Sequence, residues 1–254
     1  MPKLSAVVIT LNEEKNIGRC LDSLKGVADE IVVVDSGSAD NTRLICEEKG
    51  AHFHFHEWAG YIGQKNHANS LASHPLILSV DADEALSDKL RKSILEVKQK
   101  PAADGWVMNR LTNYCGKWIR HGGWYPDRKL RLFYRDKFEW GGERIHETII
   151  NKDQNVRVEK IDGDLLHYSY YTISEHISQA NHFTNLTAGL AVEKGKKAGL
   201  LKLLISPGFK FIRDYFFRLG FLDGYYGYVI CRISAQATFM KYSKIRQIRK
   251  QSGV

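Results

Sequence analysis

The sequence is poor in cysteine and contains no long apolar run. Its four cysteines lie far apart, with no Cys-x-x-Cys pair, at Cys20, Cys46, Cys115 and Cys231. This spacing argues against a zinc knuckle or a disulfide framework and indicates a reducing compartment. No stretch of about 18 uncharged apolar residues occurs, so we expect no ordinary membrane span. Residues 1–14 also lack the apolar core and cleavage site of a signal peptide.

What is present is an ordinary globular composition. Of the 254 residues, 43% are hydrophobic and 26% are charged, which argues against wholesale disorder. A chain of this length buries most of its unfolded surface and needs no metal or disulfide to stabilise its core. We see no internal repeat and no low-complexity linker. The length therefore suits one large domain, or one domain with an appended segment.

The net charge of +8 is unevenly distributed along the chain. Residues 194–254 contain thirteen Lys and Arg against two acids, a net of +11, whereas residues 1–193 contain 24 bases and 27 acids. A basic balance favours an anionic partner such as nucleic acid, a phosphate ligand or an acidic membrane. Because the excess lies in the C-terminal segment, it argues against nucleic acid wrapped over the whole surface.

Apolar runs and segments of helical period alternate along the first 112 residues. We expect strands at 4–10, 30–34, 51–56, 76–80 and 105–112. We expect helices from Asn12 to Leu24, from Ser38 or Asp40 to Lys49, over 61–73, and after Ser87. Strands that alternate with helices predict a parallel α/β sheet. We expect residues 115–168 to form an irregular α+β segment with short alternating runs at 128–134 and 147–150, and 172–193 to form a helix that begins at Thr172 or Ser174.

Three acidic residues follow predicted strands directly. Asp35 ends the second strand, and Asp81 and Asp83 follow the strand at 76–80. In open parallel sheets, ligands bind beyond the carboxyl ends of the strands. One carboxylate can bind a hydroxyl while the other binds a cation that bridges phosphates, and hard oxygen ligands favour Mg²⁺ or Mn²⁺. The alternative is a solvated turn or a helix cap, which is what we expect of Asp40.

Several short motifs together resemble the inverting family 2 glycosyltransferases with a GT-A fold. In chain order they are Thr10-Leu11-Asn12-Glu13-Glu14, Asp35–Thr42, Gln64-Lys65-Asn66 and Asp81-Ala82-Asp83. The resemblance is strongest to the lipopolysaccharide core glucosyltransferase branch, whose Arg-x-x-Arg-Leu-Phe and Trp…His-Glu motifs match Arg128–Phe133 and Trp140…His146-Glu147. It implies a GT-A (nucleotide-diphospho-sugar transferase), Rossmann-like α/β sandwich over residues 1–170 and a helical extension over 171–254.

The resemblance also implies a role for each matching residue. Contacts with the nucleotide sugar are implied for Thr10, Asn12, Glu13, Asp35 (uracil ring), Lys65, Asn66, Asp81 (ribose) and Arg131. The implied ligands of Mg²⁺ or Mn²⁺ are Asp83 and His167, although a histidine after two leucines is also typical of a packed core. The family often has arginine in place of Lys65, and lysine supplies a point charge in place of a planar fork.

Inverting transfer requires a base, because the acceptor hydroxyl loses a proton as it attacks the anomeric carbon. Glu147 matches the family's acidic position and is our candidate. The alternative is that Glu147 only begins a strand and that His146 is the working residue, since many relatives have Glu-Asp here. Arg128 and Arg131 are candidates for holding phosphate or acceptor, or they form a solvated strand edge.

The segment 194–254 combines eleven aromatic residues with its basic side chains. Aromatic anchors with basic flanks favour a helix that lies in a membrane interface without spanning it. The alternative is a helix that packs on the catalytic body with a basic outer face. The resemblance supports the first, because the family's acceptors are lipid-linked saccharides. We therefore expect a cytoplasmic enzyme attached peripherally to an anionic membrane surface, the inner face of the cytoplasmic membrane.

Together these features predict a metal-dependent hexosyltransferase. It would move a sugar from a UDP-sugar, UDP-glucose or similar, to a lipid-linked glycan such as lipopolysaccharide core. A sugar-1-phosphate nucleotidyltransferase is one alternative, but it would need a Gly-rich, Arg-containing loop where residues 11–15 read Leu-Asn-Glu-Glu-Lys. A non-enzymatic nucleic-acid binder is the other. The body lacks a basic stripe and its paired acids would repel phosphate, so we expect no nucleic acid partner.

Overall fold

The computed structural model describes residues 1–143 and 146–251, apart from the side chains of Glu143 and His146. The chain forms two compact units, one of residues 1–111 and 127–168 and the other of residues 112–126 and 169–254. The segment 112–126 therefore groups with the C-terminal helices. A domain boundary at residue 170 stays a prediction.

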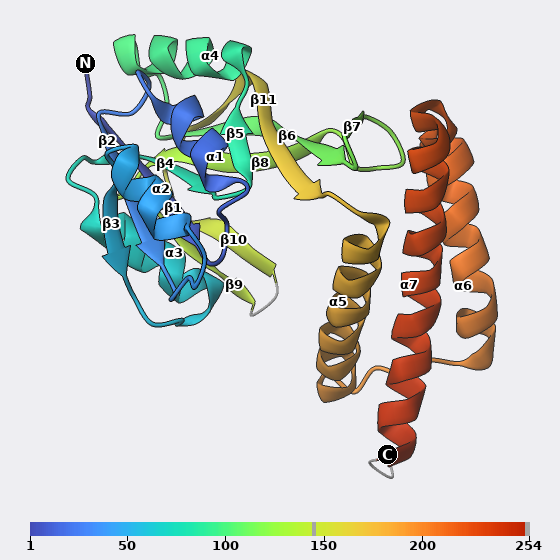
Figure 1. Ribbon diagram of the computed structural model, residues 1–254. Helices are drawn as coiled ribbons and strands as arrows, with labels where there is room; N and C mark the ends of the chain where they lie inside the picture. The colour runs from blue at the N-terminus through green and yellow to red at the C-terminus, as the bar shows by residue number, and fades with distance from the viewer. Residues whose placement is uncertain (144–145, 252–254) are drawn as a thin grey trace. The chain divides into compact units, whose positions relative to one another are not determined.

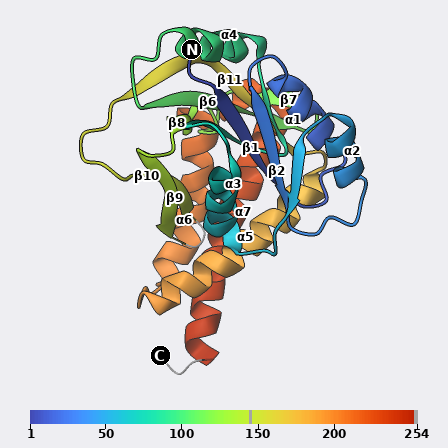
Figure 2. The same cartoon turned by 90° about the vertical axis from the view of Figure 1, so that its left-hand side faces the viewer.

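A nine-stranded sheet has the order β3-β2-β1-β4-β8-β6-β11-β5, with β7 paired to β6. Its strands are β1 (Leu4–Thr10), β2 (Glu30–Asp35), β3 (His52–Phe55), β4 (Leu76–Asp81), β5 (Glu84–Leu86), β6 (Gly105–Tyr114), β7 (Lys117–Ile119), β8 (Asp127–Tyr134) and β11 (Val158–Tyr170). The first four strands are parallel, and β1 and β2 lie side by side (Figure 2). β8 pairs antiparallel with β4 and β6, and β11 with β5. The predicted parallel α/β sheet is confirmed for the N-terminal half.

Helices cover both faces of the parallel strands. They are α1 (Ile17–Leu24), α2 (Thr42–Glu48), α3 (Gly60–Leu71) and α4 (Asp88–Gln99). Alternate residues of β1 point into different layers of the core, so that Leu4 packs with α1 and α4 on one face and Val7 packs with α3 on the other (Figure 1). A strand buried on both faces has a continuous apolar sequence, which explains the run Leu4–Thr10.

Two helix starts test the capping predictions. Ser87 accepts a hydrogen bond from Leu90 N and begins α4, as predicted. The helix predicted from Asn12 to Leu24 ends at Leu24, as predicted, but it begins only at Ile17, so the predicted start was wrong. Asn12 has a left-handed backbone (φ 54°), and its side-chain oxygen accepts from Ala39 N at 2.9 Å. Asn12 therefore joins two loops and caps no helix.

The segment expected to be irregular contains long strands. Besides β8 and β11, it forms a separate two-stranded sheet of β9 (Phe138–Glu143) and β10 (His146–Asn151). In this hairpin Glu147 lies opposite Gly142. The alternating runs at 128–134 and 147–150 coincide with β8 and β10. β11 was missed because polar and apolar residues are mixed along it, and it is buried at only two of its thirteen positions.

The second unit is helical. It contains α5 (Ile173–Glu193), α6 (Leu200–Ile212), a π-helical turn (Arg213–Phe217), a 3₁₀ turn (Gly220–Asp223) and α7 (Gly224–Gln251). α5 begins at Thr172, as predicted, in a capping box with Glu175. α7 packs against both α5 and α6 (Figure 1). No helix within residues 1–143 and 146–251 combines the length and the apolar character needed to cross a membrane.

Candidate active site

The carboxylate of Asp81 lies at the end of β4 between two cations. Its Oδ1 is 2.9 Å from Lys65 Nζ on α3, and its Oδ2 is 2.9 Å from Arg131 Nη2 on β8. Burial by itself raises the pKa of Asp81, but the charges of Lys65 and Arg131 outweigh it and hold the pKa well below its usual range. Asp81 is therefore a permanent anion at neutral pH. The structure brings together three residues that the sequence analysis assigned to the nucleotide sugar.

Glu84 lies beneath this cluster and was missed in the sequence. Its side chain is fully buried, and its Oε1 lies 3.4 Å from Arg131 Nη2 and 3.5 Å from Arg110 Nη1. Its Oε2 accepts a hydrogen bond from Asp81 N at 3.0 Å. Burial lowers the pKa of Arg131, but Glu84 and Asp81 raise it further, to above its usual range. No local pattern marked it, because Glu84 directly follows the acidic turn Asp81-Ala82-Asp83.

Trp140 covers the two cations from β9. Lys65 Nζ lies 4.3 Å from the centroid of its ring, and Arg131 Cζ lies 5.2 Å from it. Asn66 Nδ2 donates to the carbonyl oxygen of Trp140 at 2.8 Å, and Trp140 N donates to Asn66 Oδ1 at 2.9 Å. Asn66 was expected to lie near the base or diphosphate. Its side-chain amide binds the backbone of β9 and positions the indole, and the expected contact with the nucleotide sugar stays a prediction.

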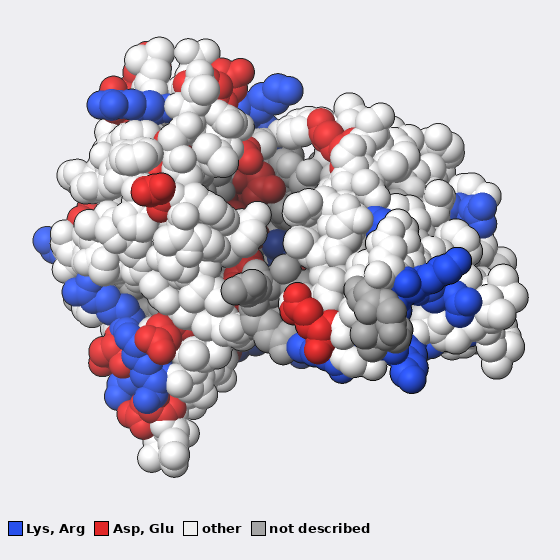
Figure 3. Space-filling model, turned by 90° about the horizontal axis from the view of Figure 1, so that it is seen from below, with Lys and Arg blue, Asp and Glu red and all other residues white. Residues whose placement is uncertain are grey.

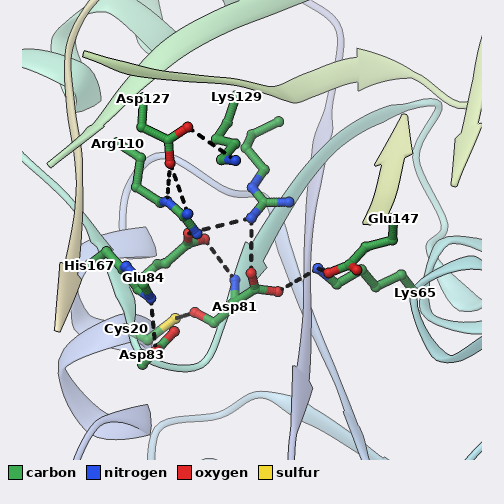
Figure 4. Close-up of polar contacts among 11 residues, drawn as sticks. Cys20, Lys65, Asp81, Asp83, Glu84, Arg110, Asp127, Lys129, Glu147 and His167 are labelled. Atoms are coloured by element: carbon green, nitrogen blue, oxygen red, sulfur yellow. Dashed lines mark hydrogen bonds and ion pairs between the residues drawn. The ribbon is translucent and has the colours of Figure 1, made fainter. Parts of the chain in front are cut away.

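Glu147 projects from β10 toward the same cluster. Its Oε1 lies 3.8 Å from Lys65 Nζ, and about a quarter of its side chain is exposed (26%). Figure 4 shows Asp81 near the centre of the group, with Glu147 and Lys65 on one side and Asp83 and His167 on the other. The side chain of His146, the alternative base, lies outside the described residues.

Asp83 and His167 are 84 positions apart in the sequence and are in contact. His167 Nε2 on β11 lies 3.1 Å from Asp83 Oδ2, and Tyr168 N donates to the carbonyl oxygen of Asp83 at 2.9 Å. Among the described residues, no group of three or more His, Cys, Asp and Glu is arranged around a metal position. Mg²⁺ often takes one or two carboxylate ligands and completes its shell with water and phosphate oxygens, so the Asp83 carboxylate fits a substrate-bridging cation.

The loop after β2 is organised by Asp35. Asp35 is buried, and its Oδ1 accepts hydrogen bonds from Gly37 N and Ser38 N, each at 2.8 Å. Its Oδ2 accepts from the Ser38 hydroxyl. The carboxylate thus shapes its own loop, as an Asx turn does. The expected contact with a uracil ring stays a prediction.

The loop after β1 lies against the loop after β2. Besides the hydrogen bond that Ala39 N donates to Asn12 Oδ1, Glu13 N donates to Thr42 Oγ1 at 2.8 Å. Burial raises the pKa of Glu13, with a further contribution from the charge of Asp83. Thr10 is buried, and its hydroxyl has no hydrogen-bond partner among the described residues. These contacts join the carboxyl ends of β1 and β2 into one surface.

A cavity of about 310 Å³ adjoins the cluster on the antiparallel side of the sheet. Its lining comes from β4, β6, β8 and the β9–β10 hairpin, and it includes Asp81, Arg128, Lys129, Arg131 and Glu147. The cavity is thus polar, with the candidate base in its wall.

Comparison with known proteins agrees with this arrangement. Residues 5–153 match the family described as Glycosyl transferase family 2. The chain is 34% identical over 260 residues to the lipopolysaccharide core biosynthesis glycosyltransferase LpsC of Rhizobium meliloti, covering 97% of this chain and 94% of the relative. It is 32% identical over 263 residues to an uncharacterized glycosyltransferase of Rickettsia felis, covering 97% and 90%. A crystal structure of glucosyl-3-phosphoglycerate synthase from Mycobacterium tuberculosis, in complex with Mn²⁺, uridine diphosphate and glucosyl-3-phosphoglycerate, aligns over 44% of each chain with 21% identity and a TM-score of 0.36.

The sheet has the parallel-rich α/β architecture that the sequence predicted, and Asp35 and Asp81 end parallel strands at the same edge of it. The family match covers the strands and loops that carry most of these residues. The GT-A fold expected from the sequence is confirmed, and the chain belongs to glycosyltransferase family 2.

Proposed function

We propose that the protein transfers a sugar, with inversion, from a UDP-linked donor to a hydroxyl of a lipid-linked glycan such as lipopolysaccharide core. The observation that carries the proposal is the meeting of Glu147 with the Lys65–Asp81–Arg131 cluster, at the carboxyl end of β4. This contact supports the proposal, because a half-buried carboxylate that can act as a base lies beside two buried cations and a strand-end acid. The LpsC relative supports the choice of acceptor.

Glu147 is the proposed base. Its carboxylate takes the proton of the acceptor hydroxyl as that oxygen attacks the anomeric carbon. The new carbon–oxygen bond forms on one face of the sugar while the bond to the donor phosphate breaks on the other, and its electron pair leaves with the diphosphate. Lys65 and Arg131 are buried and held in place, so they can stabilise the charge that develops on the leaving group without reorganising.

Asp83 and His167 are the proposed residues for Mg²⁺ or Mn²⁺. When bound, such a cation neutralises negative charge on the diphosphate. The turn that holds Asp83 is fixed by the hydrogen bond from Tyr168 N, so the carboxylate is positioned before a ligand arrives. Thr10, Asn12, Glu13 and Asp35 remain the proposed contacts of the nucleotide. Their support is the surface that their two loops build at the ends of β1 and β2.

Replacing Glu147 with Gln tests the base. We expect transfer from labelled UDP-glucose to truncated lipopolysaccharide to fall about 10²- to 10⁴-fold. Stabilisation by UDP with Mn²⁺ in a thermal-shift assay should be retained, because it reports donor binding. Glu139→Gln is the matched control, because Glu139 lies on the neighbouring strand in an exposed ion pair with Lys152. Near-normal transfer by Glu147→Gln would place the base elsewhere, with His146 as the next candidate.

Asp83→Asn tests the metal site. We expect both this variant and wild-type protein in EDTA to lose transfer, and the variant to lose the Mn²⁺-dependent part of the thermal shift with UDP. Full activity in EDTA, or a variant with unchanged turnover, would exclude a metal held by Asp83.

The helical unit supports attachment to an anionic membrane surface. α6 has no buried residue, and side chains on it and in the following turn are largely exposed, with Leu201 at 72%, Phe209 at 63% and Phe217 at 79%. Lys and Arg side chains gather beside the C-terminal end of α7 (Figure 3). An apolar, aromatic face with basic flanks is typical of helices that lie in the membrane interface.

Sedimentation with vesicles tests this attachment. We expect the protein to bind phosphatidylglycerol vesicles more strongly than neutral phosphatidylcholine vesicles. Leu201→Ser with Phe209→Ser should weaken binding without lowering thermal stability, because both side chains are exposed. If the wild-type protein binds neither vesicle, the proposed attachment is wrong.

A further inference from the structure

We propose that the helical unit binds the terminal phosphate of a membrane lipid between Lys210, Arg213 and Arg218, where α6 meets the π-helical turn. This inference rests on the membrane attachment proposed above and adds to it a site for one kind of headgroup. The juxtaposition that carries it is three cations around one buried carboxylate, beside exposed aromatic side chains.

Asp214 holds the three cations together. Its Oδ1 accepts a hydrogen bond from Arg213 Nε at 2.8 Å and lies 3.5 Å from Arg218 Nη1, and its Oδ2 lies 2.5 Å from Lys210 Nζ. Burial by itself raises the pKa of Asp214, but hydrogen bonds from Arg213 and Lys210 outweigh it and lower the pKa. Asp214 is therefore ionised at neutral pH, and the four groups have a net formal charge of +2.

This positive charge is not balanced by a further acid. Besides Asp214, the segment 194–254 contains one acid, Asp223. Its carboxylate is engaged by His121 N at 2.8 Å and by the His121 ring at 3.1 Å. The loop of residues 112–126, which donates a hydrogen bond to the end of the π-helical turn, contains no acid. In the part of the chain that the structure describes, the three cations form ion pairs only with Asp214.

The π-helical turn brings two of the cations together. Arg218 N donates to the carbonyl oxygen of Arg213 at 2.8 Å, which is an i→i+5 hydrogen bond. In an α-helix, with 3.6 residues per turn, side chains five positions apart point in different directions, whereas a π turn brings residue i+5 above residue i. Arg218 also lies against Gly123, where a Cβ would be 2.4 Å from its Nη1. Such turns are rare and occur frequently at functional sites.

The chemistry of the cluster fits a terminal phosphate. Such a group carries a charge of about −1.5 to −2 at pH 7 and has three acceptor oxygens, one for each cation. The cation side chains are 30% to 47% exposed, so a ligand can reach them. A guanidinium has five N–H donors in a planar fork that matches phosphate, and the contacts with Asp214 use one nitrogen of each arginine.

Exposed aromatic side chains beside the cluster favour a lipid over a free phosphate ion. Phe209 lies four positions before Arg213, so the two side chains share one face of the helix. Phe209 is exposed, and so are Phe216 and Phe217 in the turn. A free phosphate ion would leave these side chains in water. A lipid would place its phosphate between the cations and its acyl chains against the aromatic rings.

Sedimentation with vesicles of equal surface charge tests the site. Phosphatidylcholine vesicles are prepared with either phosphatidic acid, which has a terminal phosphate, or phosphatidylglycerol, whose phosphate is a diester. The amounts are chosen to give the same zeta potential. We expect the wild-type protein to bind the phosphatidic acid vesicles about tenfold more tightly.

Arg213→Gln and Arg218→Gln should each remove most of this preference, without a large change in melting temperature, because both side chains are partly exposed. The control is Lys250→Gln, which removes an exposed cation from the last turn of α7 and should weaken binding to both vesicles equally.

Asp214→Asn separates a built site from charge alone. The variant leaves three cations without their acid, a net formal charge of +3. Charge alone therefore predicts tighter binding to both kinds of vesicle. The site predicts loss of the preference for phosphatidic acid, because the carboxylate that aligns the cations is gone.

Three results would overturn the inference. They are equal binding of wild-type protein to the two vesicles, a preference that survives in both arginine variants, and full competition by inorganic phosphate at the concentration of phosphatidic acid, which would assign the cluster to a free anion. Calorimetry with water-soluble dihexanoyl phosphatidic acid separates this inference from the attachment. Binding that Arg218→Gln abolishes, with no sedimentation by any vesicle, would support the site and count against the attachment.

Discussion

Replacing Glu84 with Gln tests whether a buried carboxylate holds the cations of the site in place. Gln keeps the shape of the side chain and can still accept from Asp81 N, but it carries no charge. Glu84 Oε1 lies 3.4 Å from Arg131 Nη2, and at an effective dielectric constant of about 20 two unit charges at this distance attract by about 5 kcal/mol. Asp81 still compensates Arg131 in the variant. We therefore expect the free energy of unfolding to fall by about 3 kcal/mol, the lower end for breaking a buried pair.

Urea denaturation at neutral pH measures this change, and the slope of the transition should be unaltered. The matched control is Glu159→Gln. Glu159 also pairs with an arginine, Arg157, but this pair is exposed, and its loss should cost less than about 1 kcal/mol. If Glu84→Gln lowers the free energy of unfolding no more than Glu159→Gln does, burial does not strengthen the Glu84–Arg131 pair, and the prediction is wrong.

A double-mutant cycle with Arg131→Met sharpens the test. Each single variant leaves one buried charge with a single remaining partner, Asp81 for Arg131 or Arg110 for Glu84, whereas the double variant removes both charges. The combined loss should therefore be smaller than the sum of the single losses by about 2 kcal/mol. Additive losses would mean that Glu84 and Arg131 contribute independently, despite the distance between them.

Three further predictions concern other parts of the chain. Burial lowers the pKa of His176 from 6.5 to about 4. Between these two pH values the unfolded chain binds a proton that the folded chain does not, so the free energy of unfolding should fall by about 3 kcal/mol from pH 6.5 to pH 4. This pH dependence should be weaker in His176→Phe. Asn66→Ala removes two hydrogen bonds to the backbone of Trp140 and should cost about 2 kcal/mol in urea unfolding, with lower transfer activity because the indole is no longer positioned. Gly227→Ala would place a Cβ 1.9 Å from a backbone oxygen and should lower the melting temperature strongly, whereas Gly189→Ala, with open space around it, should not.

The parallel half of the fold was predictable because its signals are local. The strands at 4–10, 30–34 and 76–80 are continuous apolar runs, which is what burial on both faces requires. The rule that ligands bind at the carboxyl ends of such strands then placed Asp35 and Asp81 at one edge. Asp81 does lie in a cluster with Lys65 and Arg131. Arg131 was assigned to the same ligand only through the family motif, because no local pattern links β8 to the end of β4.

The remaining parts of the site depend on contacts that no short window contains. Glu84 follows an acidic turn and has the local pattern of a solvated residue, yet it is buried because β11 covers its strand. Trp140 was noticed only within a motif, because a ring over two cations requires β9, α3 and β8 to meet. Asparagine is a common helix-capping residue, but the side-chain oxygen of Asn12 accepts a hydrogen bond from Ala39 N in the neighbouring loop.

The pairing of β5 with β11 has a consequence for how the protein is made. Asp83 and β5 are synthesised about eighty residues before His167, and the two meet only after β11 joins the sheet. Such a non-local contact closes a long loop and forms late, so nascent chains expose the edge of β5 until then. A fragment ending at residue 153, where the family match ends, would keep that edge open. We expect such fragments to aggregate through this open edge. Pairing of β11 with β5 both closes the edge and brings His167 to Asp83, so the same step completes the sheet and the candidate metal site.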